Sequence, residues 1–198
     1  MYENKLITEP RWKSWVIQTN KPLLTPEQCK MVIDCGHKQP PQTALVGTGK
    51  AGGGNKDDNI RVTTISWIPF QEMPELYQTL DTFIQKANAN HFGFDDIRIT
   101  EQAQFTEYPE GGFYDWHMDA DMVGEHEPPV RKISMTLLLN DESEFEGGHL
   151  ELVSPGKYKE IKQGNAICFA SFLNHRVSKV TKGKRQSLVV WFGGKPFK

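Results

Sequence analysis

Two stretches with helical spacing precede a long series of short apolar runs. The first stretch predicts a helix over 26–35. Thr25 can cap this helix, Pro26 fits its first position, and Gln28 can complete a capping box with Thr25. An apolar stripe follows, and Gly36 marks the expected end of the helix.

The second stretch predicts a helix over 73–89. Its apolar residues fall on one face: Leu76, Leu80, Phe83, Ile84 and Ala87. Such a face packs against a core, so we expect both helices to lie on one side of a sheet. Between the helices, residues 60–67 are rich in β-branched side chains and predict one strand.

From residue 97 onward the pattern changes to short apolar runs separated by turn residues such as Asn140-Asp141 and Gly147-Gly148. The expected strands cover 97–108, 130–139, 148–153, 158–161, 165–169, 175–180 and 186–192. Many short strands with such turns are typical of an antiparallel sandwich or barrel. We interpret the chain as mostly β with supporting helices, forming a single domain over 1–198 in which 1–95 is helical support and 96–198 is the core.

Composition narrows the class of protein. The 198 residues include 37% hydrophobic residues, which suits one domain with a sizeable core. The formal charge of −2 gives no bulk attraction to nucleic acid or anionic lipid. No apolar run approaches the roughly 20 residues of a membrane-spanning helix, and the N-terminus has no signal-peptide core, so we expect a cytoplasmic protein. The three cysteines, Cys29, Cys35 and Cys168, are expected to be reduced and buried.

Residues 47–58 are rich in glycine and charge and are expected to form a lid or a linker. They resemble a phosphate-binding loop only superficially. Such a loop needs Gly-Lys-Ser/Thr after its spacer, whereas Gly54 is followed by Asn55-Lys56.

His117-Met118-Asp119 provides the first candidate chemistry. In an extended segment, residues i and i+2 point to the same side, so His117 and Asp119 can reach one metal ion. His175 is the best candidate for a second histidine ligand. Two histidines and one carboxylate on one face of an octahedron are typical of non-haem Fe(II) oxygenases. Zn²⁺ would prefer a closed tetrahedral site, and Ca²⁺ an all-oxygen cage.

Arg185 lies ten residues after His175, at the start of the last expected strand. A 2-oxo acid that chelates iron at one end needs its distal carboxylate fixed, and a guanidinium can donate two parallel hydrogen bonds to it. Ser187 lies on the same strand face and could donate a third. This spacing indicates 2-oxoglutarate as the co-substrate.

The second half of the chain resembles the Fe(II)/2-oxoglutarate-dependent dioxygenase superfamily, in particular its prolyl 4-hydroxylase-like, PKHD-type branch. The matching stretches are Tyr108-Pro109-Glu110-Gly111, Tyr114-Asp115-Trp116-His117-Met118-Asp119, Leu138-Leu139-Asn140, Glu146-Gly147-Gly148-His149-Leu150, Asn174-His175-Arg176-Val177 and Arg185-Gln186-Ser187-Leu188. In the first half, a variable loop, an arginine-containing strand at Arg61 and a long helix match in layout.

The resemblance implies a double-stranded β-helix (jelly roll) and the roles of several residues. His117, Asp119 and His175 would bind Fe(II), and Arg185 would pair with the distal carboxylate of 2-oxoglutarate. Tyr108 would hydrogen-bond to the co-substrate. Dioxygen would be the oxidant, and ascorbate is a further candidate cofactor.

Two positions depart from the family pattern. Some relatives carry a tyrosine where this chain has Leu138. Leucine cannot donate a hydrogen bond, so Ser187 or Thr136 is expected to replace it. The residue at His149 is usually acidic, and the change is expected to alter a turn at most.

The expected reaction is hydroxylation of a C–H bond, with release of succinate and CO2. The favoured substrate is a prolyl residue of a peptide or protein that lies under the loop at 44–59, and this expectation rests on the resemblance alone. Candidate substrate contacts are Trp116, Trp191, Tyr114 and Arg61.

Three other readings stay open. The first is the same chemistry on a free amino acid, a small metabolite or a nucleobase. The second is a cupin-like metal or sugar binder, although cupins use an H-x-H pair. The third is an interaction protein on a retained fold, which an intact ligand set disfavours. The oligomeric state stays open as well.

Overall fold

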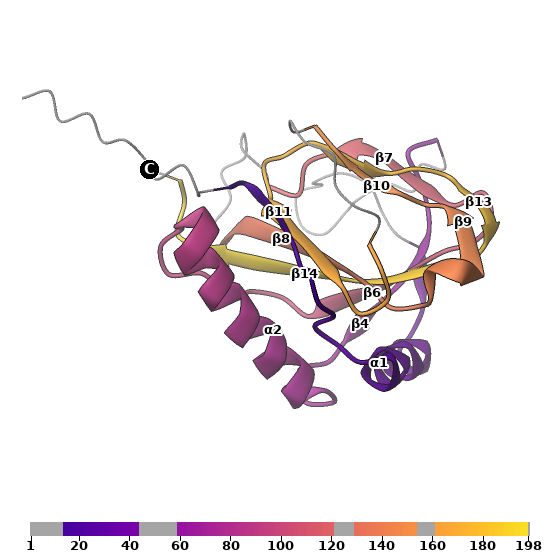
Figure 1. Ribbon diagram of the computed structural model, residues 1–198, viewed down its shortest axis with the longest axis horizontal. Coiled ribbons are helices and arrows are strands. Elements are labelled where there is room, and N and C mark those ends of the chain that lie inside the picture. Colours follow the sequence, from indigo (N-terminus) through magenta and orange to yellow (C-terminus); the bar gives the residue numbers. More distant parts are fainter. Residues whose placement is uncertain (1–13, 44–58, 121–128, 154–160, 198) are drawn as a thin grey trace, which may run out of the picture.

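The computed structural model describes residues 14–43, 59–120, 129–153 and 161–197. Within them, two sheets face each other and two helices cover the outer face of the larger one (Figure 1). All strand pairs are antiparallel. The mostly-β architecture with a jelly-roll core and supporting helices is confirmed.

The larger sheet has eight strands. In spatial order they are β1 (Val16–Gln18), β11 (Ala166–Ala170), β8 (Val130–Leu138), β14 (Arg185–Gly194), β6 (Ala103–Tyr108), β4 (Thr64–Ile68) and β2 (Gln42–Thr43), with β5 (Arg98–Ile99) paired to β14. The smaller sheet consists of β10 (Leu150–Leu152), β12 (His175–Val177), β7 (Phe113–His117) and β3 (Arg61–Val62). A third pair joins β13 (Val180–Gly183) to β9 (Phe145–Gly147), which follows a 3-10 turn at Glu142–Glu144.

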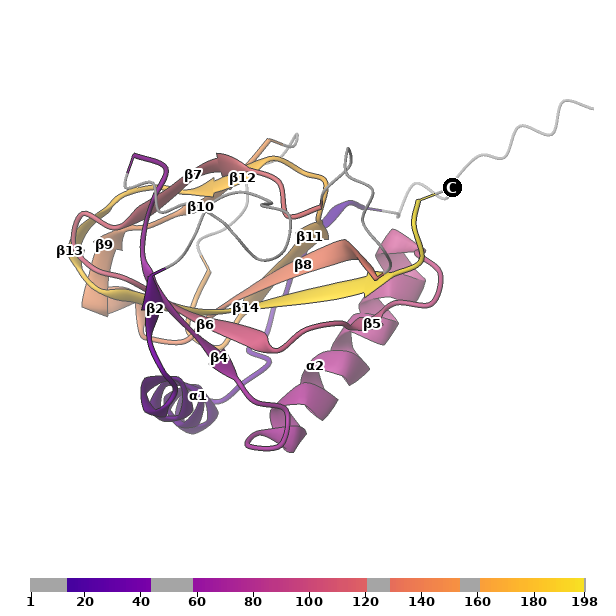
Figure 2. The ribbon, with the colours of Figure 1, turned by 180° about the vertical axis from the view of Figure 1, so that it is seen from behind.

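The two helices, α1 (Pro26–Lys38) and α2 (Pro74–Ala87), lie on the same side of the larger sheet, as expected (Figure 2). Alternate residues of the sheet strands point toward them and form the main core with the helix side chains. The remaining residues of these strands point toward the smaller sheet. The larger sheet is therefore covered on both faces, and its inner face is the surface on which a site can be built.

Helix α1 begins as predicted but ends later. Gln28 N–H donates to the Thr25 hydroxyl at 3.3 Å, and Thr25 N–H donates to the Gln28 side chain at 2.9 Å, which confirms the capping box. The predicted end at Gly36 is wrong, because the helix continues to Lys38. A Cβ at Gly36 would overlap the Phe105 ring, so this glycine allows close packing of α1 on β6 rather than ending the helix.

Helix α2 confirms the second predicted helix, and a single π-helical turn over Asn88–Phe92 follows it. Leu76, Leu80, Ile84 and Ala87 are buried as expected. Phe83 is only partly buried at the edge of the core.

The single strand predicted over 60–67 is wrong, because the segment forms two strands in different sheets. Arg61 pairs with Tyr114 in the smaller sheet, whereas Thr64 pairs with Glu107 in the larger one. The chain crosses between the sheets at Thr63. High β propensity predicts extended backbone but cannot show a change of partner.

The later strands agree with the prediction more closely. Strands β8, β11 and β14 confirm the runs at 130–139, 165–169 and 186–192, and shorter strands β10 and β12 lie in 148–153 and 175–180. The run at 97–108 divides into β5 and β6. Strands β1, β2, β7, β9 and β13 were not predicted. The loop at 44–59 and the run at 158–161 lie almost entirely outside the described residues.

Strands from before residue 95 take part in both sheets. The division of the domain into 1–95 and 96–198 stays a prediction.

Cys29, Cys35 and Cys168 are free and buried, which confirms the expectation for the three cysteines. Within the described parts of the chain, neither helix is long and apolar enough to cross a membrane.

Candidate metal centre

Three side chains predicted as metal ligands converge between the two sheets. His117 is the last residue of β7, Asp119 follows two residues later, and His175 begins β12. His117 and His175 are paired across the smaller sheet. One donor atom from each of the three residues lies within 4.8 Å of the others. The Nε2 atoms of His117 and His175 are 3.7 and 3.6 Å from the Asp119 carboxylate oxygens.

The orientation of both imidazoles suits a metal ion. His117 Nδ1 is 2.7 Å from the Asp115 carbonyl oxygen, and His175 Nδ1 is 3.0 Å from that of Leu173. A carbonyl only accepts, so each Nδ1 carries the proton and each Nε2 offers its lone pair to the centre of the cluster.

Asp119 is held by the larger sheet. The Ser134 hydroxyl on β8 donates to Asp119 Oδ2 at 2.6 Å, and the Asp119 N–H donates to the Ser171 carbonyl oxygen at 3.0 Å. Burial alone would raise the pKa of the Asp119 carboxyl, but the two histidines and the Ser134 hydroxyl hold it below its ordinary value. The carboxylate is therefore anionic at neutral pH.

His117 is packed under a tyrosine. The Tyr114 and His117 rings are stacked with centroids 3.5 Å apart, and the Arg61 guanidinium lies 4.3 Å from the Tyr114 centroid. Burial, together with the neighbouring His175, lowers the pKa of His117 to about 4. His117 is therefore neutral at pH 7, which is the form that binds metal ions.

Arg185 lies apart from these three residues, at the first position of β14. It is 1% exposed, and burial lowers its pKa, although a guanidinium remains charged at neutral pH. Arg185 Nη1 donates to the Ser187 hydroxyl at 2.9 Å. Nη2 is buried, and no described residue accepts a hydrogen bond from it. A buried guanidinium with an unused donor is a site for an anion.

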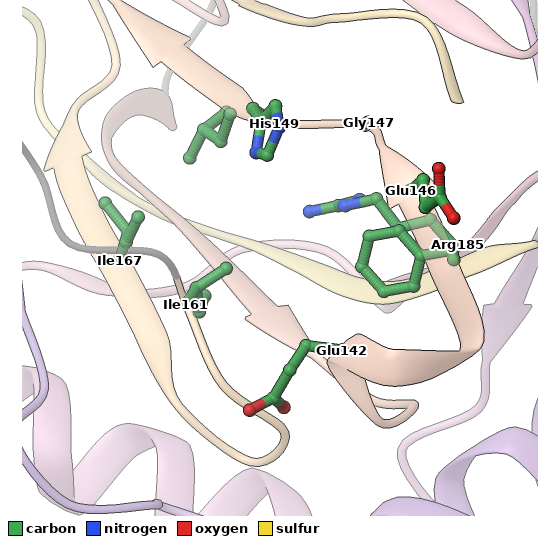
Figure 3. A pocket seen from close by; sticks show the side chains of 10 residues that line it. Glu142, Glu146, Gly147, His149, Ile161, Ile167 and Arg185 are labelled. Carbon is green, nitrogen blue, oxygen red and sulfur yellow. The ribbon is translucent and has the colours of Figure 1, made fainter. Parts of the chain in front are cut away.

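A cavity of about 460 Å³ lies beside Arg185. Figure 3 shows the guanidinium directed into this space between His149 and the two isoleucines Ile161 and Ile167. His149 is exposed at its rim, and its N–H donates to the Ser178 hydroxyl. The cavity shows that the unused donor of Arg185 faces space rather than packed side chains.

The residues expected around Arg185 differ in what they contact. Tyr108 is paired with Arg185 across the strands, with its ring centroid 5.4 Å from the guanidinium carbon. Leu138 lies directly opposite Ser187 and is fully buried. Thr136 lies on the same sheet face but is opposite Val189. Of the two proposed replacements for a tyrosine at 138, Ser187 is the one that contacts the guanidinium.

The two candidate tryptophans lie on different faces. Trp191 is 5% exposed and is paired with Ser134, beside the three metal-ligand candidates. Its Nε1 is buried without an acceptor among the described residues, and the Arg131 guanidinium lies 3.8 Å from its ring centroid. Trp116 is 40% exposed and contacts Arg176. Its neighbour His117 points inward, so Trp116 lies on the outer face of the smaller sheet.

Comparison with known proteins agrees with this arrangement. A family model described as "2OG-Fe(II) oxygenase superfamily" matches residues 103–193, which include all three metal-ligand candidates and Arg185. Over these residues the chain is similar to the 2OG-Fe(II) oxygenase superfamily. This similarity, together with the cluster of two histidines and one aspartate, points to Fe(II), 2-oxoglutarate and dioxygen.

The curated relatives that match this chain are PKHD-type hydroxylases. The chain is 32% identical over 93 residues to a PKHD-type hydroxylase of Acidovorax ebreus, a match that covers 44% of this chain and 41% of that protein. The chain thus spans less than half the length of this relative.

Two solved structures share the fold of this chain. A Pseudomonas putida prolyl-4-hydroxylase matches with a TM-score of 0.66 and 21% identity over 92% of this chain and 94% of that one. A Trichoplax adhaerens prolyl hydroxylase, in complex with a peptide fragment of a hypoxia inducible factor oxygen degradation domain, matches with a TM-score of 0.60 and 19% identity over 90% of this chain and 83% of that one.

Two residues of the site were not predicted from the sequence. Ser134 fixes Asp119 by donating a hydrogen bond to its carboxylate. In the sequence, this role was indicated only by a small hydroxyl residue at a position of β8 that faces the smaller sheet. Gly148 leaves space for the Arg185 side chain, because a Cβ at position 148 would lie 2.9 Å from Arg185 Cδ. The sequence indicated this position only as the second residue of Gly147-Gly148, which we interpreted as a turn.

Proposed function

We propose that this protein is an Fe(II)- and 2-oxoglutarate-dependent dioxygenase that hydroxylates a C–H bond and releases succinate and CO2. The observation that carries the proposal is the combination of two inward-facing Nε2 atoms and one carboxylate with a separate buried guanidinium that has an unused donor. The first set suits a metal ion with open positions, and the second suits the far end of a dicarboxylic co-substrate.

His117, Asp119 and His175 would hold the iron. Their donor atoms are 3.6–3.7 Å apart along the two histidine–carboxylate edges, which leaves room for an ion at roughly 2.0–2.2 Å from each. Bound iron together with 2-oxoglutarate supplies the oxidising chemistry, because both are needed to activate dioxygen. The protein contributes fixed ligands, a carboxylate whose charge is retained and a site between two sheets in which the three ligand side chains are 6–16% exposed.

Arg185 would bind the distal carboxylate of 2-oxoglutarate. Ser187 orients the guanidinium by accepting from Nη1, which leaves Nη2 for the co-substrate. Burial raises the pKa of Tyr108, so its hydroxyl stays protonated and can donate to the same ligand. Thr136 remains a candidate for a further contact from the same sheet face.

We further propose a prolyl residue of a peptide or protein as the substrate. Support comes from the PKHD-type relatives and from the Trichoplax enzyme, whose structure contains a peptide fragment. The Tyr114 ring and the inward-facing Trp191 would wall the substrate position, and the unused Trp191 Nε1 could donate to a substrate carbonyl. Ascorbate would act as a reductant that restores Fe(II).

Succinate formation tests this proposal. Purified protein with Fe(II), 2-oxoglutarate and ascorbate is incubated aerobically with prolyl peptides, free amino acids or oligonucleotides, and succinate and hydroxylated product are measured together. We expect one class to give both products in equal amounts, and the His175→Ala variant to give neither. Succinate formation that persists in His175→Ala would contradict the assignment of the ligands. Metal binding without succinate formation on any substrate would favour a cupin-like binder.

A further inference from the structure

Arg61 is a second buried arginine near the metal-ligand candidates. It lies on β3 and is only 8% exposed. Its guanidinium carbon is 4.3 Å from the centroid of the Tyr114 ring, whose other face stacks on His117. The charge of Arg61 contributes to the pKa shifts of Tyr108, Tyr114 and His117, which places it among the side chains of the site.

The surroundings of Arg61 repeat those of Arg185. Each arginine is followed two residues later by a hydroxyl residue that accepts a hydrogen bond from it: Thr63 from Arg61 Nε at 3.0 Å, and Ser187 from Arg185 Nη1 at 2.9 Å. Each arginine is also paired across the strands with a tyrosine, Tyr114 in the smaller sheet and Tyr108 in the larger one. The two sheets thus hold two similar arrangements of Arg-x-Ser/Thr facing a tyrosine.

Burial makes the charge of Arg61 expensive unless an anion is near. Moving an ion out of water costs several kcal/mol even after relaxation. Among the described residues, no carboxylate forms an ion pair with Arg61, and neither Nη atom donates a hydrogen bond. Thr63 accepts from Nε, so an incoming carboxylate would meet the two Nη atoms, whose end-on fork matches its two oxygens.

The other arginine beside the site does not compete for an anion. Arg131 donates to both carboxylate oxygens of Glu101, at 2.7 and 2.6 Å, and its charge is therefore already neutralised. A single guanidinium with no carboxylate partner in the described part of the chain suits a carboxylate better than a phosphate, whose higher charge would call for a second cation. Arg61 and Arg185 both influence the pKa of Tyr108, and only Arg185 lines the cavity beside His149.

We propose that Arg61 is a second carboxylate anchor and that the substrate of this enzyme carries a carboxylate close to the hydroxylated C–H bond. The inference rests on the proposed function and narrows its substrate. The carboxylate can come from a free amino acid, from the C-terminus of a peptide or from an acidic side chain beside the reacting residue. Thr63 is a positioning residue that fixes the plane of the guanidinium.

Matched acid and amide ligands test the proposal. The enzyme is loaded anaerobically with Fe(II) and 2-oxoglutarate and titrated with three sets of pairs: L-proline and other free amino acids against their amides, prolyl peptides ending in an acid against the same peptides ending in an amide, and internal Pro-Asp peptides against Pro-Asn peptides. Binding is read from the visible iron–2-oxoglutarate band and from the unfolding temperature. We expect at least one acid to bind at least about tenfold more tightly than its amide, and the responding set identifies the source of the carboxylate.

Variants assign the preference to Arg61. Arg61→Gln should remove the difference between acid and amide, whereas Arg61→Lys should retain part of it because the charge remains. Arg98→Gln, on the exposed edge strand β5, is the matched control and should behave as the wild type. The band formed without substrate reports that each variant is folded and binds 2-oxoglutarate.

Several results would overturn the inference. One is that no acid in the three sets binds better than its amide. Another is that Arg61→Gln leaves the preference intact. A third is that Arg61→Gln weakens 2-oxoglutarate binding as Arg185→Gln does, which would place Arg61 in the co-substrate site. If the wild type forms no band at all, the proposed function fails and this inference with it. A normal band with equal binding of acids and amides rejects the inference alone.

Discussion

Arg185 in the larger sheet and Arg61 in the smaller sheet have similar partners but different surroundings. Each has a hydroxyl partner two residues on and a tyrosine across the strand pair. Arg185 is 1% exposed in a sheet covered on both faces, and it lines a cavity of about 460 Å³. Arg61 is 8% exposed and lies beside the tyrosine that stacks on His117. Under the two proposals, location relative to the metal-ligand candidates, rather than local geometry, separates a co-substrate anchor from a substrate anchor.

The two sheets also differ in their outer faces. The larger sheet is backed by α1 and α2, which fixes its inner side chains in a continuous core. The smaller sheet exposes Trp116 and the Arg176–Glu151 ion pair on its outer face. Under the two proposals, the co-substrate anchor Arg185 lies on the sheet that is covered on both faces, and the substrate anchor Arg61 lies on the sheet whose outer face is exposed.

The largest expected effect comes from Arg185→Gln. Each charge-assisted hydrogen bond contributes about 1.5–3 kcal/mol, so losing the guanidinium should raise the Kd of 2-oxoglutarate by at least about tenfold per bond. Anaerobic titration of the visible band measures this Kd, with Arg98→Gln as the control. An unchanged Kd would place the co-substrate anchor elsewhere. Arg185 and Arg61 could then no longer be compared as two anchors.

Ser134→Ala tests how the larger sheet supports the metal ligands of the smaller one. Removing the hydroxyl that donates to Asp119 at 2.6 Å should lower Fe(II) affinity about 10–100-fold, while the Kd of 2-oxoglutarate at saturating iron stays the same. Fe(II) titration measures the first quantity. Ser66→Ala is the matched control, because Ser66 is equally buried but donates to the Gly36 carbonyl on the helix side. Equal losses of affinity in the two variants would contradict a specific role of Ser134.

Gly148→Ala tests the clearance around Arg185. The added Cβ would lie 2.9 Å from Arg185 Cδ, and overpacking of about 1 kcal/mol should raise the Kd of 2-oxoglutarate several-fold. Gly111→Ala is the control, because Gly111 also has positive φ but a Cβ there would meet nothing within 4 Å. Both variants should lose about 1 kcal/mol of folding stability in denaturant unfolding, and only Gly148→Ala should weaken co-substrate binding. Weakening by both variants would point to backbone strain instead.

The smallest effects should come from the hydroxyl partners. Ser187→Ala and Thr63→Ala each remove one acceptor from a guanidinium, a change of about 1 kcal/mol or several-fold in Kd. Ser187→Ala should weaken only 2-oxoglutarate, and Thr63→Ala only the carboxylate ligand of the substrate site. Titrating each variant with both ligands measures the separation. If Ser187→Ala also weakened the carboxylate ligand of the substrate site, or Thr63→Ala also weakened 2-oxoglutarate, the two arginines would share one ligand.

Much of the site could be predicted because its chemistry is local in the sequence. His117 and Asp119 are two residues apart, so an extended backbone is enough to place them on one side. Ser187 was expected beside Arg185 for the same reason, and the structure shows the contact. His175 required a distant pairing, which the spacing to Arg185 and the family resemblance supplied.

The rest depended on contacts between distant segments. Ser134 reaches Asp119 only because β8 lies beneath the end of β7. Gly36 was interpreted as the end of a helix, since the sequence cannot show that Phe105 packs against that point of α1. The change of sheet at Thr63 was missed because β propensity is the same for any partner strand. That change also gives Arg61 its place beside Tyr114.

The visible spectrum of the anaerobic Fe(II) and 2-oxoglutarate complex tests the central claim most directly, because it needs the metal ligands and the co-substrate but no substrate. We expect a weak charge-transfer band in the wild type that appears only when both are present. We expect the band to be absent in His175→Ala at any practical concentration of iron. A band of wild-type strength in His175→Ala, or no band in the folded wild-type protein, would contradict the account.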